Sequence, residues 1–296
     1  MEILLLIFLT GWAITYLKPE IRDSYKKINK LIIYIVIPCL TFSKVSQLKI
    51  SDNILYPAAA AWVIFIIAAI FIYAIAKPFQ LNKKTIGCLI LCCGLGNTSF
   101  IGYPFIQYYF GEKNMTYAIF VDQPGSFLIL STLGISVATY FGSNKHDLKA
   151  IIRKIISFPP FIIFIAALVI PSFWIDSNII NRLASIGKLV TPLAIFSIGM
   201  QFNLNFKEIP WKSFFIGIVY KLVLAPLIIY ITYFIILQKN NMISTISVIE
   251  CAMPPMITAS ILATEFELDE KLAASLPTLG LLVSIPTLLI WKSILT

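Results

Sequence analysis

The sequence predicts an all-α integral membrane protein with ten transmembrane helices, built as two inverted repeats of five helices each. Three observations lead to this prediction. Of the 296 residues, 59% are hydrophobic and only 12% are charged, whereas soluble domains carry about 25% charged residues. Apolar stretches of membrane-spanning length recur along the whole chain, and a short motif of the first half returns in the second half.

A helix needs about 20 mostly apolar residues to cross a bilayer. The first stretch is short, and the second carries Lys44 near its end, so their bounds are the least sharply defined. The ten stretches are residues 3–17, 31–48, 55–76, 85–110, 116–141, 157–175, 179–201, 211–237, 243–264 and 271–293.

The basic residues lie in short tracts between the apolar stretches, although the net charge of +9 would also suit a nucleic-acid binder. Alternate loops differ about twofold in their content of Lys and Arg, as the positive-inside rule expects of a multi-pass protein. With ten helices, this bias places both termini on the non-cytoplasmic side of the cell membrane. The bilayer, and no nucleic acid, is therefore the expected partner.

The cysteines fall inside apolar stretches, and the single His146 lies in a loop. None of the spacings is CxxC, so neither a metal centre nor a disulfide framework is expected, and no cofactor is implied. Small buried hydrophobic side chains are the default role for such cysteines.

An internal repeat divides the chain. Pro38, Phe42 and Ser43 recur 154 positions later as Pro192, Phe196 and Ser197, which aligns the second stretch with the seventh and the fourth with the ninth. Because five is odd, the second copy must enter the membrane the opposite way up, as in many secondary transporters. The predicted parts are a first repeat over 1–141, a cytoplasmic linker over 142–156 and a second repeat over 157–296.

The fourth and ninth stretches both carry helix-breaking residues. Residues 94–105 read GLGNTSFIGYPF and residues 250–256 read ECAMPPM. Unwound backbone survives in a membrane only where protein or trapped water covers it, so we expect the two breaks to cover each other and to form a central solute site. The predicted substrate-binding residues are Asn97, Thr98, Ser99, Gly102, Pro104, Met253, Pro254 and Pro255. The alternative is structural, with glycines that only permit close helix packing and prolines that only kink helices.

Three ionisable residues inside the apolar stretches stand out, namely Asp122, Lys221 and Glu250. Such residues are costly in lipid and usually functional. Glu250 lies one helical turn before Pro254, so its carboxyl can bind Na⁺ near Asn97 or carry a proton as the coupling ion. Asp122 is a second candidate, with an interfacial carboxylate as its alternative. Lys221 can attract an anion, with a structural ion pair as its alternative, and Glu265 is expected at the membrane interface.

Several motifs together resemble the auxin efflux carrier family. Gly96-Asn97-Thr98 with Gly102 and Pro104 is similar to the fourth-helix motif of that family. Further resemblances lie in Pro192-Leu193-Ala194 with Phe196, Ser197, Gly199 and Met200, in Lys221 with Pro226, in Ala252-Met253-Pro254, in Glu265-Phe266 and in Ser284-Ile285-Pro286. The resemblance implies crossing broken helices, a fold related to bile acid symporters and sodium/proton antiporters, and elevator-type alternating access by a scaffold and a mobile crossover domain.

The resemblance therefore implies a secondary active permease of a small organic anion, such as a malate-, malonate- or auxin-like carboxylate. The chain lacks the long cytoplasmic loop of long plant carriers, which favours a bacterial-type permease. The alternatives are a Na⁺-coupled symporter of bile acid symporter type, an anion channel, a receptor without transport, and an intramembrane enzyme using Asp122 and Glu250. No nucleophile motif or phosphate loop supports an enzyme. Related folds also suggest a homodimer.

Overall fold

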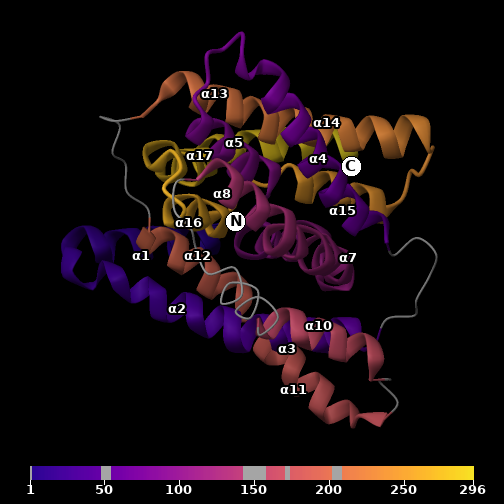
Figure 1. The fold of residues 1–296 in the computed structure, drawn as a ribbon. Helices are drawn as coiled ribbons and strands as arrows, with labels where there is room; N and C mark the ends of the chain where they lie inside the picture. Colours follow the sequence, from indigo (N-terminus) through magenta and orange to yellow (C-terminus); the bar gives the residue numbers. More distant parts are fainter. Residues whose placement is uncertain (1, 48–54, 143–157, 171–173, 202–208) are drawn as a thin grey trace. The chain divides into compact units, whose positions relative to one another are not determined.

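The computed structural model describes residues 2–47, 55–142, 158–170, 174–201 and 209–296. Apart from Gly142, the predicted linker lies outside the described residues. The described chain is helical and contains no β-strand (Figure 1). Six of its helical segments are long and apolar enough to cross a bilayer: Pro19–Val45, Tyr56–Ala76, Glu112–Phe141, Ser177–Gln201, Trp211–Ile236 and Glu270–Leu295. The prediction of an all-α, multi-pass membrane protein is confirmed, whereas the number of ten helices and their inverted arrangement stay predictions.

The chain divides into two compact units, and each takes segments from both predicted repeats. Unit 1 comprises Met1–Ser51, Ser99–Ile119 and Arg153–Asn203, and unit 2 comprises Asp52–Thr98, Phe120–Ile152 and Leu204–Thr296. The predicted halves at 1–141 and 157–296 are therefore not the compact units of the fold. The duplication that they describe stays a prediction.

Unit 1 contains short apolar helices packed in two groups. Helix α1 packs along α12, while α10 and α11 pack against α3 (Figure 1). Its helices are α1 (Glu2–Leu17), α2 (Tyr25–Leu31), α3 (Ile37–Val45), α6 (Tyr103–Phe110), α10 (Pro159–Val169), α11 (Ser177–Gly187) and α12 (Val190–Gln201).

Two glycines allow α1 and α12 to touch through their backbones. A Cβ atom on Gly199 would meet the carbonyl oxygen of Phe8, and one on Gly11 would meet the carbonyl oxygen of Phe196. Small residues serve this purpose at membrane helix interfaces, where close packing takes the place of a hydrophobic driving force. Gly199 therefore has a packing role in unit 1.

Unit 2 is built around α5 (Lys83–Gly94), whose residues from Thr85 onward are all buried. Helices α4, α8, α13, α16 and α17 pack against α5, and α15 packs against α4. These helices are α4 (Tyr56–Ala76), α8 (Ile135–Phe141), α13 (Trp211–Val219), α14 (Ala225–Tyr230), α15 (Met242–Cys251), α16 (Ile257–Glu265) and α17 (Glu270–Leu295), while α7 (Met115–Val121) passes from one unit into the other.

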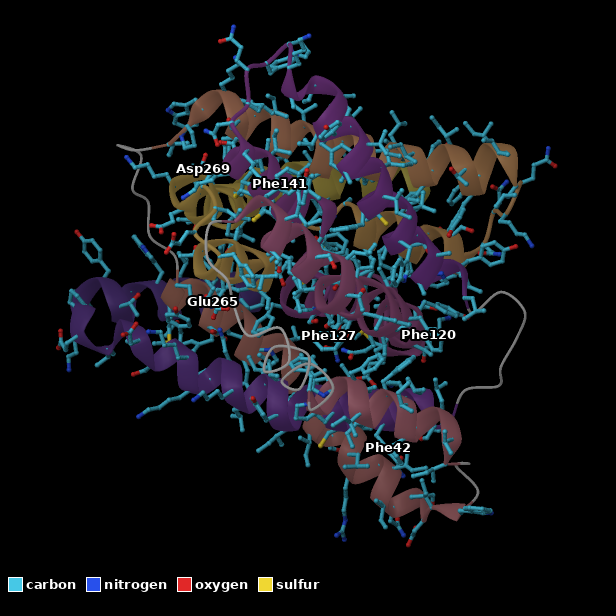
Figure 2. The ribbon with its side chains drawn as sticks, viewed as in Figure 1. Phe42, Phe120, Phe127, Phe141, Glu265 and Asp269 are labelled. Carbon is cyan, nitrogen blue, oxygen red and sulfur yellow. The ribbon has the colours of Figure 1, made fainter. Side chains whose placement is uncertain are left out.

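Polar side chains cap the starts of α5 and α17 in unit 2. The side chain of Asn82 accepts from the Thr85 N–H at the start of α5, and that of Asp269, which is labelled in Figure 2, accepts from the Leu272 N–H at the start of α17. The Thr85 hydroxyl also donates to Asp269 at 2.8 Å, which ties the two helix starts together. Such caps satisfy N–H groups that the first helical turn leaves without partners.

Four prolines lie within or just after short π-helical segments. These segments are η2 (Ile32–Val36) before Pro38, η3 (Thr98–Gly102) before Pro104, η5 (Asp122–Phe127) around Pro124 and η8 (Tyr220–Leu224) before Pro226. A wider helical turn accommodates a residue that has no N–H and lets the helix continue. These prolines therefore modify helices without ending them.

Candidate functional site

The two predicted breaks in the fourth and ninth stretches meet inside unit 2. Helix α5 ends at Gly94 and α15 ends at Cys251, and the chain becomes helical again at Thr98 and Ile257. The Asn97 N–H donates to the Pro254 carbonyl oxygen at 2.8 Å, and the Met256 N–H donates to the Leu95 carbonyl oxygen at 3.1 Å. These bonds form an antiparallel bridge between Gly96 and Pro255, which we call the crossing. The breaks thus satisfy each other's backbone groups, as the membrane requires.

The position of the first break differs from the sequence prediction. Pro104 was expected to interrupt the fourth stretch, but the chain stays helical through Pro104, and the break lies at residues 95–97. The π-helical turn η3 explains why Pro104 is tolerated. The second break does contain its prolines, because Pro254 and Pro255 both lie between α15 and α16.

The crossing brings together five of the predicted substrate-binding residues. Asn97 and Thr98 on one side and Met253, Pro254 and Pro255 on the other are all buried in unit 2. Ser99, Gly102 and Pro104 follow Thr98 in the chain but belong to unit 1. The role of all eight residues in binding a solute stays a prediction.

Lys221 reaches the crossing from η8. Its Nζ lies 3.0 Å from the point where a Cβ atom on Gly96 would stand, and the Glu250 carbonyl oxygen lies 3.2 Å from the same point. A side chain at position 96 would require these groups to shift by a few tenths of an ångström. Gly96 thus permits the close approach of the ammonium group, and whether it has a role beyond packing stays a prediction.

Asp122 is buried in unit 2, with 1% of its surface exposed. The Thr98 hydroxyl donates to its Oδ1 at 2.5 Å, and the Gln123 side-chain amide donates to its Oδ2 at 2.7 Å. Hydrogen bonds to a carboxylate are stronger than hydrogen bonds between neutral groups. Asp122 is therefore enclosed by protein in unit 2, while its depth in the bilayer stays a prediction.

Glu250 and Lys221 are both fully buried, with 0% of their surface exposed. Within the part of the chain that the structure describes, neither carboxyl oxygen of Glu250 has a hydrogen-bond partner, and the Lys221 Nζ has none either. Nor does Lys221 form an ion pair there, in contrast to Lys44 and Lys188, which both pair with Glu112 in unit 1. Buried polar groups without partners are costly, which marks this pair as a functional candidate.

Replacing Thr98 with Val should lower the stability of unit 2, because Asp122 would lose one of its hydrogen-bond donors. Bonds to charged groups contribute about 1.5–3 kcal/mol each, so the apparent Tm of the purified protein in detergent should fall by several degrees. Thr98→Ser keeps the hydroxyl and serves as the control. Equal apparent Tm values for the Val and Ser variants would show that this hydrogen bond contributes nothing.

Gln123 is a site residue that the sequence analysis missed. It is 2% exposed, it donates to Asp122, and its own carbonyl oxygen has no hydrogen-bond partner among the described residues. The neighbouring Pro124 carbonyl accepts from the Trp62 indole N–H at 2.9 Å, which fixes this segment to α4. The signal for this residue in the sequence was a polar glutamine directly after Asp122 inside an apolar stretch.

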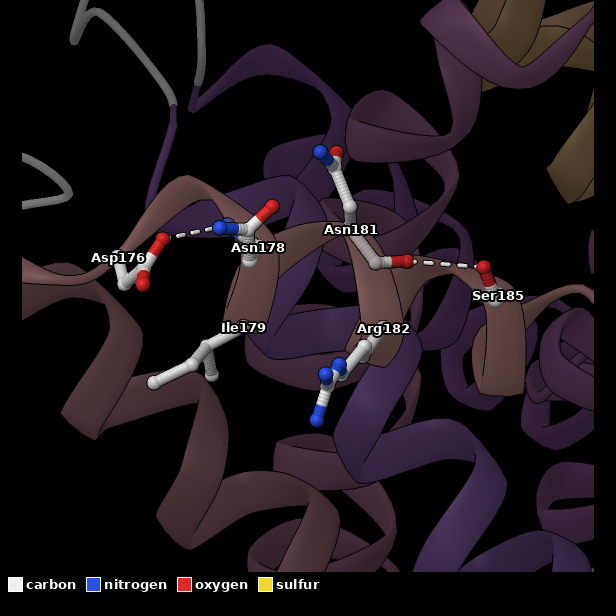
Figure 3. Close-up of a pocket in the computed structure, with 6 residues that line it drawn as sticks. All are labelled: Asp176, Asn178, Ile179, Asn181, Arg182 and Ser185. Atoms are coloured by element: carbon white, nitrogen blue, oxygen red, sulfur yellow. Dashed lines mark hydrogen bonds between the residues drawn. The ribbon is translucent and has the colours of Figure 1, made fainter.

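Two other features do not involve the crossing residues. Glu265 is exposed at the end of α16, where an interfacial residue is expected. A surface pocket of about 410 Å³ lies along α11 in unit 1 and is lined by exposed side chains (Figure 3). It contains none of the predicted site residues; its lining is Asp176, Asn178, Ile179, Asn181, Arg182 and Ser185.

No group of three or more His, Cys, Asp or Glu side chains within the described ranges is arranged to hold a metal ion. Among the described residues of unit 2, the buried side-chain oxygens without a hydrogen-bond partner belong to Glu250 and Gln123. The expected binding of Na⁺ near Asn97 and Glu250 stays a prediction.

Interrupted helices that cover each other's backbone in a multi-pass membrane protein are typical of membrane transporters. The chain belongs to the membrane transport protein family, whose model matches residues 1–292, and this confirms the resemblance to the auxin efflux carriers. It is similar to an uncharacterized transporter of Methanocaldococcus jannaschii, with 29% identity over 99% of this chain and 97% of the relative. An uncharacterized transporter of Methanothermobacter thermautotrophicus is 24% identical over 98% of this chain and 96% of that relative. The family and these names indicate a transporter rather than an enzyme.

Proposed function

We propose that this membrane transport protein is a secondary active transporter of a small organic anion, and that the crossing is its solute site. The observation that carries the proposal is the bridge between Gly96 and Pro255, which joins two interrupted helices beside three buried ionisable side chains. Paired helix breaks at mid-membrane are the recurrent substrate sites of secondary transporters.

The helix ends at the crossing suit a carboxylate. Helix α16 begins at Ile257, directly after the bridged residue Met256, and the N–H groups of its first turn have no partners within the helix. A helix N-terminus carries partial positive charge and favours anions. The ammonium of Lys221 adds a full positive charge in the same unit. A small mono- or dicarboxylate is therefore the solute class that we propose.

We assign the coupling role to Glu250, with Asp122 as a fixed charge. Asp122 already accepts hydrogen bonds from Thr98 and Gln123. Glu250 has no donor among the described residues, so its carboxyl is either protonated and neutral or ionised and paired with a bound Na⁺. Separate pH and Na⁺ gradients across proteoliposomes distinguish the two ions.

The two compact units support an elevator-type mechanism, because that mechanism requires two bodies that move as wholes. Unit 2 holds the crossing and the three buried ionisable residues, and unit 1 holds α1, α3, α10, α11 and α12. We propose that unit 2 is the mobile body and unit 1 the scaffold.

Asn97→Ala should abolish solute binding while the protein still folds, because the bridge uses the backbone N–H of Asn97 and not its side chain. The measurement is a thermal-shift screen of the purified protein against malonate, malate and other small carboxylates, with and without Na⁺ and at two pH values. A ligand that binds the folded state raises its apparent Tm. Counterflow of the radiolabelled ligand in proteoliposomes then measures transport.

Asn181→Ala, which removes an exposed asparagine of α11, is the matched control and should retain both binding and flux. Unchanged binding in Asn97→Ala would remove this side chain from the solute site. A screen in which no carboxylate raises the apparent Tm, together with no flux of malonate or malate, would overturn the proposed solute class.

A further inference from the structure

The helix that carries Lys221 widens into a π-helical turn at this residue. Lys221 lies in the π-helical segment η8, and Pro226 follows at the start of α14. In an α-helix the carbonyl of Leu222 would accept from the N–H of residue 226, which is a proline and has none. Pro226 therefore cannot supply the donor that an α-helical turn would give to the Leu222 carbonyl.

Side chains from two other helices hold the residues on both sides of Lys221. The Trp291 indole N–H, from α17, donates to the Leu222 carbonyl oxygen at 2.9 Å. The Tyr220 hydroxyl donates to the Ile64 carbonyl oxygen of α4 at 2.5 Å, and its ring stacks on Phe71 with centroids 5.3 Å apart. Trp291 is 8% exposed and Tyr220 is 1% exposed. The indole thus supplies a donor to the carbonyl that Pro226 leaves without its α-helical donor.

We propose that Trp291 and Tyr220 are positioning residues that fix the Lys221 ammonium against Gly96 at the crossing. This inference rests on the proposed function insofar as Lys221 belongs to the solute site. Lysine has a long, flexible side chain, so the place of its Nζ depends on how firmly the backbone at its root is held. The backbone of residues 220–222 is held by α4 on one side and by α17 on the other.

The chain offers a control that removes the same chemical group nearby. The Tyr233 hydroxyl donates to the Tyr56 carbonyl oxygen at 2.6 Å, which is also a bond from η9 (Ile231–Ile236) to the α4 backbone. Tyr233 does not flank Lys221. Tyr233→Phe therefore matches Tyr220→Phe in volume and in the kind of hydrogen bond that is lost.

The experiment measures how fast Lys221 of the full-length protein in detergent reacts with acetic anhydride, followed by mass spectrometry of the peptide that contains it. A buried amine reacts only through local opening. Loss of one buried hydrogen bond beside Lys221 should raise its labelling rate about fivefold in Trp291→Phe and in Tyr220→Phe, and should leave the rate unchanged in Tyr233→Phe.

Rescue tests the role of Trp291 directly. Pro226→Ala restores a backbone N–H that can donate to Leu222, so the double variant Pro226→Ala with Trp291→Phe should return the rate to within about twofold of the wild type. Unchanged labelling in both Trp291→Phe and Tyr220→Phe would overturn the proposal, as would an equal increase in Tyr233→Phe. If Trp291→Phe does not fold, the labelling rate of Lys221 in Tyr220→Phe is compared with that in Tyr233→Phe, and this comparison decides the test. The assay needs no solute, so a failure of the proposed transport function is seen separately.

Discussion

Replacing Lys221 with Met is expected to raise the apparent Tm of the protein and to lower solute flux at least tenfold. The Lys221 ammonium is fully buried and has no hydrogen-bond partner within the described residues. An uncompensated buried polar group costs about 1–3 kcal/mol in mutational data, and methionine fills much of the same volume without that cost. Because about 1 kcal/mol shifts Tm by roughly 2–4 °C in larger domains, the expected rise is several degrees.

Thermal unfolding in detergent and malonate counterflow in proteoliposomes measure the two effects. Lys84→Met replaces an exposed lysine of α5 and should change neither quantity appreciably. A gain in stability with loss of flux is the pattern expected of a residue kept for function at a cost to the fold. A Lys221→Met protein that is less stable than the wild type would instead show that Lys221 supports the structure.

Gly96→Ala should destabilise unit 2 and reduce solute flux at least tenfold. The new Cβ would stand 3.0 Å from the Lys221 Nζ and 3.2 Å from the Glu250 carbonyl oxygen. The lysine side chain can move away, but the carbonyl belongs to the backbone at the end of α15 and cannot move without straining the crossing. Overpacking of this kind costs about 1–3 kcal/mol.

Gly134→Ala is the matched control in the same unit, because its new Cβ would meet its nearest neighbours at 3.4 Å, an ordinary contact distance. The measurements are the apparent Tm and malonate counterflow of both variants. Wild-type flux in Gly96→Ala would mean that the distance between residue 96 and Lys221 has no bearing on transport.

The sequence was sufficient to predict that both helices are broken, but not which residues of the two breaks pair with each other. Glycines at 94 and 96 and the pair Pro254-Pro255 are poor helix formers, and lipid excludes bare backbone, so two covered breaks could be expected. The register that joins Gly96 to Pro255 depends on how distant segments pack, which no local pattern encodes. Pro104 does not break the helix as predicted, because the π-helical turn η3 before it lets the helix continue without the N–H that proline lacks.

Local sequence also says little about how deeply a charged side chain is buried inside the folded protein. Asp122 lies near the start of an apolar stretch, which suits the interface, yet the hydroxyl of Thr98 from another segment completes its buried environment. The closeness of Lys221 to Gly96 and the bond from Trp291 to Leu222 likewise join residues far apart in the chain. Such pairs emerge only from tertiary packing.

The bridge at the crossing has a consequence for the engineering of selectivity. It is made by the backbone N–H groups of Asn97 and Met256 and the carbonyl groups of Pro254 and Leu95. The frame of the crossing therefore does not depend on the Asn97 or Met256 side chains, which can be exchanged while the frame persists. If the crossing is the solute site as proposed, a library of variants at these two positions is expected to change solute selectivity while the backbone bonds of the bridge are kept.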